Sequence, residues 1–556
     1  MSSVPDNKPL AHLQKNHTFV LIRVRTCFPD AEKSGNIMRI PFEDMKRLTA
    51  ILALVLALMV SCSRGADDEQ LMRKWIATIS SDEFGGRKPM TEYEKITTDY
   101  LISQLDSLGI APAFDGSYTQ EVRLISTVSS FDGGGISFTG KNGSGRLCIP
   151  DDFVAWTARP DETAELRAAE FVFCGFGIDA PEFGWNDFAG TDLKGKIILA
   201  MVNDPGFYDE NLFQGKNMTY HGRWTCKFEQ AARMGAAGCL VIHNTAAAGY
   251  GWNVCANHTG SNLALFDEES RNSDKLPMNG WIHEDGCRKL FECAGIDLDK
   301  ALEAAKKPGF KAVPMGLKAD ALIRVSSEIK TSSNVGGILP GREFPDEAVV
   351  FSGHWDHLGI GTPDEKGDSI YNGAADNASG MAATLLCAAR AKQLRKAPKR
   401  SLLFLFYTSE ESGLFGSEHY CAHPAKAMDK TVACINFESM APEALTKDVV
   451  VLGGNTPLDD YILKGAEAQG RYVVFNQDNS DGWFFRSDHF NFVKKGVPAV
   501  VIETGSDLAN PGHPNKYPFQ SWYHKPSDEY HPDWDLSGSL AHWKLMFGVG
   551  LEMANF

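Results

Sequence analysis

Short apolar runs alternate with a helical pattern through the second half of the chain, and this alternation is what most limits the possible folds. Each run has the length of a strand and stops at a polar or glycine-rich turn, whereas the helical pattern follows a candidate N-cap at Asn377. Strands that alternate with helices predict a layered α/β sheet that presents its chemistry at the strand ends. We expect strands at 348–351, 401–407, 431–437 and 497–502, and a helix over 379–396.

The turns after these runs carry imidazole and carboxylate groups. Two zinc ions about 3.5–4 Å apart need a bridging ligand, and a carboxylate can supply one oxygen to each ion. Asp376 is the candidate bridge, and His354 and Glu411 are candidates for further ligands. Asp356 lies two residues after His354, on the same side of an extended chain, where it would hold the imidazole in one tautomer.

The neighbouring glutamates Glu410 and Glu411 are expected to differ in role, because adjacent carboxylates cannot both face one metal in an extended segment. With Glu411 as a ligand, Glu410 stays free as the general base for a water that bridges the metals. Downstream, the strand at 431–437 ends at Glu438, and His524 is the expected last imidazole, with Asp528 placed to orient its ring.

Taken together, these motifs resemble the di-zinc aminopeptidase and glutamate carboxypeptidase family of clan MH metallopeptidases. The resemblance spans roughly residues 70–140 and 318–556 and implies a three-layer α/β/α peptidase domain with a mixed, largely parallel sheet. It rests on five motifs in order, namely His354-x-Asp356, Asp376-Asn377-x-Ser-Gly380, Glu410-Glu411-x-Gly, Glu438 and Tyr523-His524.

The resemblance also implies the cofactor and its ligands. Two zinc ions per chain would bind, one to His354, Asp376 and Glu438 and the other to Asp376, Glu411 and His524, with Glu410 as the catalytic base and Asp356 in support. Aminopeptidases of this family commonly carry Asp where this chain has Glu438, so this ligand is one methylene longer.

A different pattern runs from 148 to 315 and divides the predicted peptidase domain into 68–147 and 318–556. Residues 170–177, 193–202 and 231–242 are typical of strand, turn, strand, helix and strand. Their order and the phrase DLKGKIILAMV resemble the protease-associated domain, a β-rich α+β insert that covers or shapes the substrate cleft in several family members. A solvent-exposed insert without substrate contact is the alternative.

The first 62 residues are expected to concern export. Residues 1–44 are polar and are interpreted as an over-called gene start or a disordered leader, with Met45 as the possible true start. Lys46 and Arg47 precede an eleven-residue apolar run that is too short to span a bilayer, so 45–62 predicts a signal peptide. The end of this segment at Cys62 resembles a bacterial lipobox, which predicts a periplasmic protein or a lipoprotein anchored to the membrane.

Charge and the remaining motifs narrow the function. A net charge of −16 and a pI near 5.4 argue against a nucleic-acid partner, and the resemblance implies peptide substrates. We expect an exported aminopeptidase, with a Ser-Asp-His loop at Asp488 near the substrate. A carboxypeptidase or dipeptidase would need a cationic pocket, for which Arg486 is the candidate. Glutaminyl cyclase, a single-zinc relative, and a receptor-like binding protein fit less well, because the metal motifs are intact.

The remaining histidines lack ligand spacing and are expected to be bystanders. They include His357, although it lies beside Asp356 and therefore near the cleft. After the predicted signal peptide, the others are His221, His243, His258, His283, His419, His423, His489, His513, His531 and His542.

Overall fold

In a computed structural model of the chain, strand β14 (Phe344–His354) is an inner strand of the sheet that carries the predicted metal site. The structure describes residues 65, 67–440, 442–454, 456–476, 479–513 and 516–556. From Gly65 onward the chain forms one compact unit. The predicted leader, signal peptide and lipobox lie outside the described residues and remain predictions.

The sheet of the peptidase part is mixed and largely parallel, as expected. β14 pairs in parallel with β17 (Arg400–Tyr407) and β18 (Thr431–Asn436), and β18 pairs in parallel with β21 (Ala499–Val500). β13 (Val313–Leu339) runs antiparallel to β17, and the short β1 (Ala111–Pro112) pairs with β13. A separate three-stranded sheet contains β19 (Asp448–Leu452), β20 (Tyr472–Asn476) and β22 (Ile502–Thr504), and β15 (Gly359–Ile360) pairs with β16 (Ile370–Tyr371).

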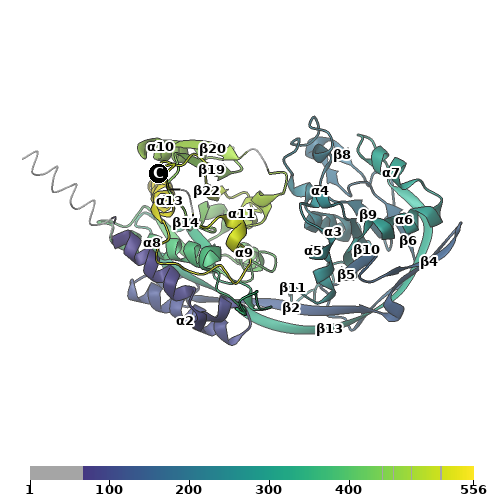
Figure 1. Cartoon of the computed structure of the whole chain (residues 1–556), viewed down its shortest axis with the longest axis horizontal. Helices are drawn as coiled ribbons and strands as arrows, with labels where there is room; N and C mark the ends of the chain where they lie inside the picture. Colours follow the sequence, from purple (N-terminus) through teal and green to yellow (C-terminus); the bar gives the residue numbers. More distant parts are fainter. Residues whose placement is uncertain (1–64, 66, 441, 455, 477–478, 514–515) are drawn as a thin grey trace, which may run out of the picture. The chain divides into compact units, whose positions relative to one another are not determined.

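Both faces of this sheet are buried, and alternate residues of β17 belong to two different cores. Leu402, Phe404 and Phe406 lie in the larger core, whereas Leu403 and Leu405 lie in the smaller one. This period of two explains why the strands read as nearly continuous apolar runs. The helices on the larger core are the one at 67–79, α2 (Glu92–Ser107), α8 (Ser379–Lys392), α10 (Asp459–Ala468) and α13 (Ser537–Asn555); α9 (Phe415–Ala422) and α11 (His489–Lys494) cover the other face (Figure 1).

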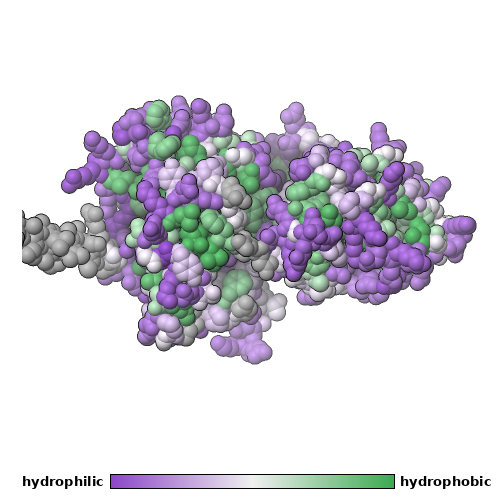
Figure 2. Space-filling view, turned by 90° about the horizontal axis from the view of Figure 1, so that it is seen from above, coloured by the Kyte–Doolittle hydropathy of each residue, from purple (hydrophilic) through white to green (hydrophobic). Residues whose placement is uncertain are grey.

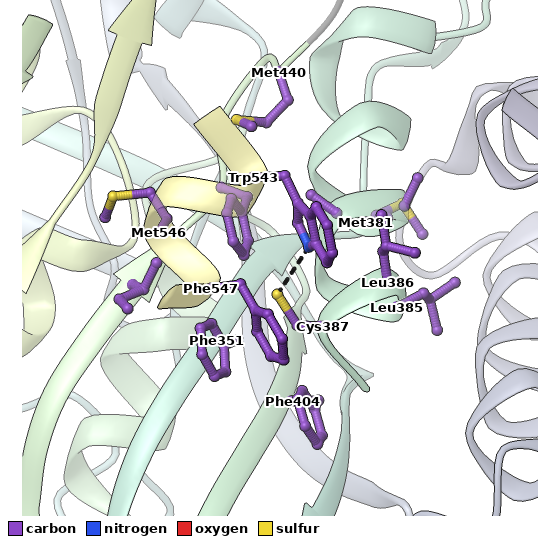
Figure 3. Close-up of a cluster of buried hydrophobic side chains, with 14 of the residues drawn as sticks. Phe351, Met381, Leu385, Leu386, Cys387, Phe404, Met440, Trp543, Met546 and Phe547 are labelled. Carbon is purple, nitrogen blue, oxygen red and sulfur yellow. Dashed lines mark hydrogen bonds between the residues drawn. The ribbon is translucent and has the colours of Figure 1, made fainter. Parts of the chain in front are cut away.

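The larger core holds α8 and α13 against the sheet. Trp543 of α13 donates from its indole nitrogen to the sulfur of Cys387 in α8 at 3.2 Å, and Phe547 packs beside Phe351 of β14 (Figure 3). This packing holds α8, which begins at Ser379, just after the turn that contains Asp376.

The predicted insert carries the other part of the same 15-stranded sheet, with helices on both faces. β6 (Thr163–Phe173), β9 (Ile197–Met201), β10 (Gly238–Ile242) and β12 (Asn279–Ile282) are parallel, and β5 (Phe153–Trp156) is antiparallel to β12. Helices α6 (Glu284–Ala294) and α7 (Leu298–Ala305) contribute to one core, and α3 (Trp224–Arg233), α4 (Thr245–Ala248) and α5 (Trp252–Ala256) lie on the other side. The predicted order of strand, strand, helix and strand is therefore present.

β13 joins this part of the sheet to the peptidase part, because one end pairs with β6 and the other with β17. It also runs beside β2 (Thr119–Phe131), and Figure 1 shows the two long strands together. The core of the insert begins at Phe131 and reaches Val325, so it extends beyond 148–315 at both ends. The smaller strands here are β3 (Gly135–Gly140), β4 (Gly143–Cys148), β7 (Asp179–Ala180), β8 (Trp185–Asn186) and β11 (Ser261–Leu265).

The visible surface is mostly hydrophilic, with smaller hydrophobic areas between the polar residues (Figure 2). Within the described residues, no helix combines the length and the apolar character needed to cross a membrane.

Candidate metal centre

The predicted ligands converge because three parallel strands end at the same edge of the sheet. His354 is the last residue of β14, Glu410 and Glu411 follow β17, and Glu438 follows β18. Asp376 lies in the turn before α8, and His524 follows the short helix α12 (Phe519–Trp522). The carboxyl ends of parallel strands are where open α/β sheets place their ligands.

One group of possible ligands contains His354, Asp376 and Glu438. Nε2 of His354 lies 2.9 Å from Oε1 of Glu438 and 3.2 Å from Oδ1 of Asp376. One ligand atom from each of the three residues lies within 4.8 Å of the others. His354 is fully buried, and its Nδ1 contacts the backbone carbonyl of Asp356 at 3.0 Å.

A second group shares Asp376 and adds Glu411 with two imidazoles. Nε2 of His524 lies 3.0 Å from Oε2 of Glu411 and 3.4 Å from Oδ2 of Asp376. His357, which the sequence analysis treats as a bystander, contacts Oε1 of Glu411 at 2.7 Å and forms a possible ligand group with Asp376 and Glu411. Each oxygen of Asp376 thus faces a different imidazole, as a bridging carboxylate requires.

The carboxylate of Asp356 was expected to orient the imidazole of His354, but it has a different role. It accepts hydrogen bonds from the backbone amides of Glu410 at 3.0 Å and Glu411 at 3.3 Å, whereas its Oδ1 is 3.7 Å from Nδ1 of His354. The imidazole is instead oriented by the backbone carbonyl of Asp356. Asp356 therefore fixes both the ring of His354 and the turn that separates the two glutamates.

Asp528 likewise supports a ligand other than the one expected. It accepts from the amides of Ala375 at 2.7 Å and Asp376 at 3.0 Å, so it positions the bridging residue and not the ring of His524. The prediction that Asp528 orients the ring of His524 was wrong. Closeness in sequence does not place the two side chains together here, because the carboxylate of Asp528 lies under the turn at Asp376.

Glu438 is held through its second oxygen. Ser487 donates to Oε2 at 2.7 Å, while Oε1 faces His354. The side-chain nitrogen Nδ2 of Asn436 donates to the hydroxyl of Ser487 at 2.7 Å, and the hydroxyl of Ser352 donates to the side-chain oxygen Oδ1 of Asn436 at 2.8 Å. These contacts define the direction of the longer glutamate side chain.

Residues 334–547 match the model of peptidase family M28. This part of the chain is an M28 peptidase domain. The mouse aminopeptidase NAALADL1 is 32% identical over 36% of this chain and 26% of its own length, and a probable leucine aminopeptidase 2 of Aspergillus oryzae is 29% identical over 57% of this chain and 53% of its own length.

The chain therefore spans between about a quarter and a half of these relatives. Among solved structures, an aminopeptidase from Aneurinibacillus sp. strain AM-1 aligns with a TM-score of 0.47 and 18% identity, covering 87% of this chain and 93% of that protein.

Below the metal ligands of the M28 domain lies a fully buried cation, Arg87. Its guanidinium donates to the carbonyl oxygens of Trp355 at 2.9 Å, Asn372 at 2.6 Å and Gly373 at 2.9 Å. Burial lowers the pKa of Arg87 to about 10, and the nearby carboxylates, Asp528 foremost, oppose this shift. The turn at Asp82–Arg87 is thus part of the floor of the site.

The pKa shifts in the M28 domain indicate how strongly its acidic groups need cations. Burial alone would raise the pKa of Glu411, but hydrogen bonds from His357 and His524 hold it at about 2. Burial also lowers the pKa of His524, and hydrogen bonds to Asp376 and Glu411 outweigh burial and raise it to about 10. Metal binding would replace such protons, because imidazole ligands bind metals in the neutral form.

This donor set fits zinc. Each group combines imidazole nitrogen with carboxylate oxygen, the ligand types that Zn²⁺ accepts, and Asp376 belongs to both groups. His354, Asp376 and Glu438 would hold one ion, and Asp376, Glu411 and His524 the other.

Glu410 is close to both groups without belonging to either. Its Oε2 is 3.9 Å from Nε2 of His354, and the residue lines the cavity above the site. Burial raises the pKa of Glu410 well above the usual range; His354 opposes this, and Glu438 and Glu411 add to it. A carboxylate with a raised pKa and access to substrate is suited to proton transfer.

A cavity of about 1200 Å³ opens over the M28 site and is also lined by the insert. The insert contributes Trp156, Tyr220, Arg223, Trp224 and His258. The stacking of His258 on Trp156, with ring centroids 4.0 Å apart, had no signal in the sequence, because nothing there shows which residues of an insert face a cavity.

The two predicted substrate contacts differ in position. Arg486 lines the cavity and lies over the ring of Trp483, 4.9 Å from its centroid. Asp488 is buried beside the site and is not among the described residues that line the cavity. Burial raises the pKa of Asp488 to about 7. A direct contact between Asp488 and substrate is therefore not favoured by its position.

Proposed function

We propose that the chain is an exported di-zinc aminopeptidase that removes N-terminal residues from peptides. The observation that carries this proposal is the shared position of Asp376 between two groups of imidazole and carboxylate ligands at the floor of one cavity. The M28 domain and the names of the relatives, both aminopeptidases, support the reaction class.

The residues of the site divide the work of peptide hydrolysis. Bound zinc would polarise the scissile carbonyl and lower the pKa of a water molecule. Glu410 takes a proton from the attacking water as the water oxygen bonds to the carbonyl carbon. It then delivers this proton to the leaving amine as the C–N bond breaks. Asp356 keeps Glu410 directed into the cavity, because it holds the backbone amide of this residue.

Activity on a panel of substrates, before and after chelation, tests this function. We expect hydrolysis of aminoacyl-anilides and of peptides with a free N-terminus, and no hydrolysis of peptides with an acetylated N-terminus. Chelation should abolish the activity and added zinc should restore it, because the ligands provide the only described metal groups of three or more residues. Cleavage of the acetylated peptides, or activity that survives complete metal removal, would contradict the proposal.

A carboxypeptidase or dipeptidase is the second candidate, and one observation favours it. Arg223 of the insert and Arg486 of the M28 domain both line the cavity, and neither forms an ion pair within the described residues. Burial lowers the pKa of Arg223 to about 10, and repulsion from Arg486 adds to this shift. Two half-buried guanidinium groups on the cavity wall, without a carboxylate partner among the described residues, form a site suited to the free carboxylate of a short peptide.

Replacement of Arg223 separates the two candidates. If this pair binds the substrate carboxylate, Arg223→Met should raise KM for free dipeptides about 10- to 100-fold and leave KM for their C-terminal amides unchanged. Arg233→Met is the matched control, because Arg233 is exposed at the far end of α3. Equal effects of Arg223→Met on dipeptides and amides would remove the support for a carboxylate subsite.

A further inference from the structure

His357 has no role in the proposed reaction, yet it is buried against the metal site. Only 1% of its surface is exposed, and its ring centroid lies 5.8 Å from that of His524. Gly373 leaves room for the ring, since a Cβ at this glycine would lie 2.6 Å from Cδ2 of His357. The imidazole is therefore held in one place by its surroundings.

The contacts of Glu411 divide its two oxygens between two imidazoles. Oε1 is 2.7 Å from Nδ1 of His357, and Oε2 is 3.0 Å from Nε2 of His524. An ionised carboxylate is only an acceptor, so Nδ1 of His357 must carry the proton and donate it. Glu438 shows the same division, because Ser487 donates to one oxygen and His354 faces the other.

Three distances argue that His357 is a hydrogen-bond donor and not a metal ligand. With zinc–ligand bonds near 2.0–2.1 Å, two ligand atoms of a tetrahedral ion lie about 3.3 Å apart. The distances from Nε2 of His524 to Glu411 and Asp376, 3.0 Å and 3.4 Å, bracket this value. The 2.7 Å between His357 and Glu411 is shorter and fits a hydrogen bond to a charged acceptor.

We propose that His357 is a positioning residue for the second metal. It donates from Nδ1 to Oε1 of Glu411 and thereby turns Oε2 of the same carboxylate toward Asp376 and His524. The inference rests on the proposed function, since it assumes that Glu411 is a metal ligand. It predicts that this histidine controls how tightly the second ion binds.

Metal titration of two variants of equal size tests the proposal. The side-chain nitrogen of Asn is two bonds from Cβ, as Nδ1 of His is, so His357→Asn keeps a donor that His357→Leu removes. We expect His357→Leu to bind its second zinc or cobalt ion about 10- to 100-fold more weakly, the usual cost of losing a group that orients a ligand. His357→Asn should stay within a few-fold of the unmodified chain, and both variants should bind the first ion normally.

His524→Ala provides the reference for loss of a true ligand. If His357→Asn binds the second ion as weakly as His524→Ala, and the absorption spectrum of bound cobalt changes in the same way, His357 is a ligand and the proposal is wrong. Normal binding of the second ion by His357→Leu also overturns it. Thermal melts after chelation show whether each variant is folded, and His357→Met, which also lacks a donor, replaces Leu if that variant is not.

The readout also separates this inference from the proposed function. Metal affinity is measured without substrate, so an unmodified chain that binds two ions but cleaves no peptide would contradict the aminopeptidase proposal alone. An unmodified chain that binds fewer than two ions would contradict the di-zinc proposal, and with it the assumption that Glu411 is a ligand.

Discussion

Glu410→Gln should retain close to two zinc ions per chain and lose about 10²–10⁴-fold in kcat. The amide of Gln has nearly the shape of the carboxylate, but it cannot take a proton from water at neutral pH. Glu410 belongs to neither group of possible ligands, so metal binding should change little. Substrate binding should also stay close to normal, and added zinc should not restore the rate.

Metal analysis beside steady-state kinetics checks this result. Glu411→Gln is the informative comparison, because it should lose one ion and recover part of its activity in excess zinc. Glu418→Gln is the control for removing a carboxylate from the cavity wall, and it should leave kcat unchanged. If Glu410→Gln turns over normally, or releases zinc as readily as Glu411→Gln, the two glutamates have been assigned the wrong roles.

The sequence predicts the ligands at strand ends because their placement follows from strand direction alone. His354 ends an apolar run, and Glu411 and Glu438 lie in the turns that follow two others. Parallel pairing of β14, β17 and β18 brings those strand ends together. Asp376 and His524 lie outside these strands. Their place in the site follows from the resemblance and from the turn before α8.

Side-chain directions within the turns could not be predicted in the same way. His357 and Asp356 are neighbours in the chain. The sequence does not reveal that the ring of His357 turns toward Glu411, whereas the carboxylate of Asp356 turns toward backbone amides. Asp528 is a similar case, since its partners lie about 150 residues earlier in the chain. Such contacts depend on tertiary packing and leave no periodic pattern.

The C-terminal boundary of the insert could not be predicted from the sequence, because the long strand β13 runs through it. This strand continues from the sheet of the insert into the peptidase sheet, and its residues pair with β6, β2 and β17 in turn. A change of domain normally coincides with a turn or a linker, whereas here one strand serves both cores. Val325 and Val335 both lie in β13, yet Val325 packs in the core of the insert and Val335 in the larger core of the peptidase part.

Arg87→Met should lower the free energy of unfolding by about 3–5 kcal/mol, the usual cost of breaking a buried charged network. The guanidinium donates to the carbonyl oxygens of Trp355, Asn372 and Gly373, which would lose their donor in a region closed to water. The same cation faces four buried carboxylates, with Asp528 making the largest contribution. Its loss therefore removes hydrogen bonds and the local compensating charge together.

Urea denaturation after chelation measures this effect without the stabilisation that bound metal adds. Arg324→Met removes the same guanidinium from the surface, where 59% of the side chain is exposed and its Nε pairs with Asp132 at 2.7 Å, and it should leave the urea midpoint nearly unchanged. Arg87→Lys keeps the charge but not the fork of donors, so it should lie between the unmodified chain and Arg87→Met. If Arg87→Met unfolds at the same urea concentration as Arg324→Met, the three carbonyl groups do not depend on this cation, and the floor of the site is held by the packing of Trp355 and its neighbours alone.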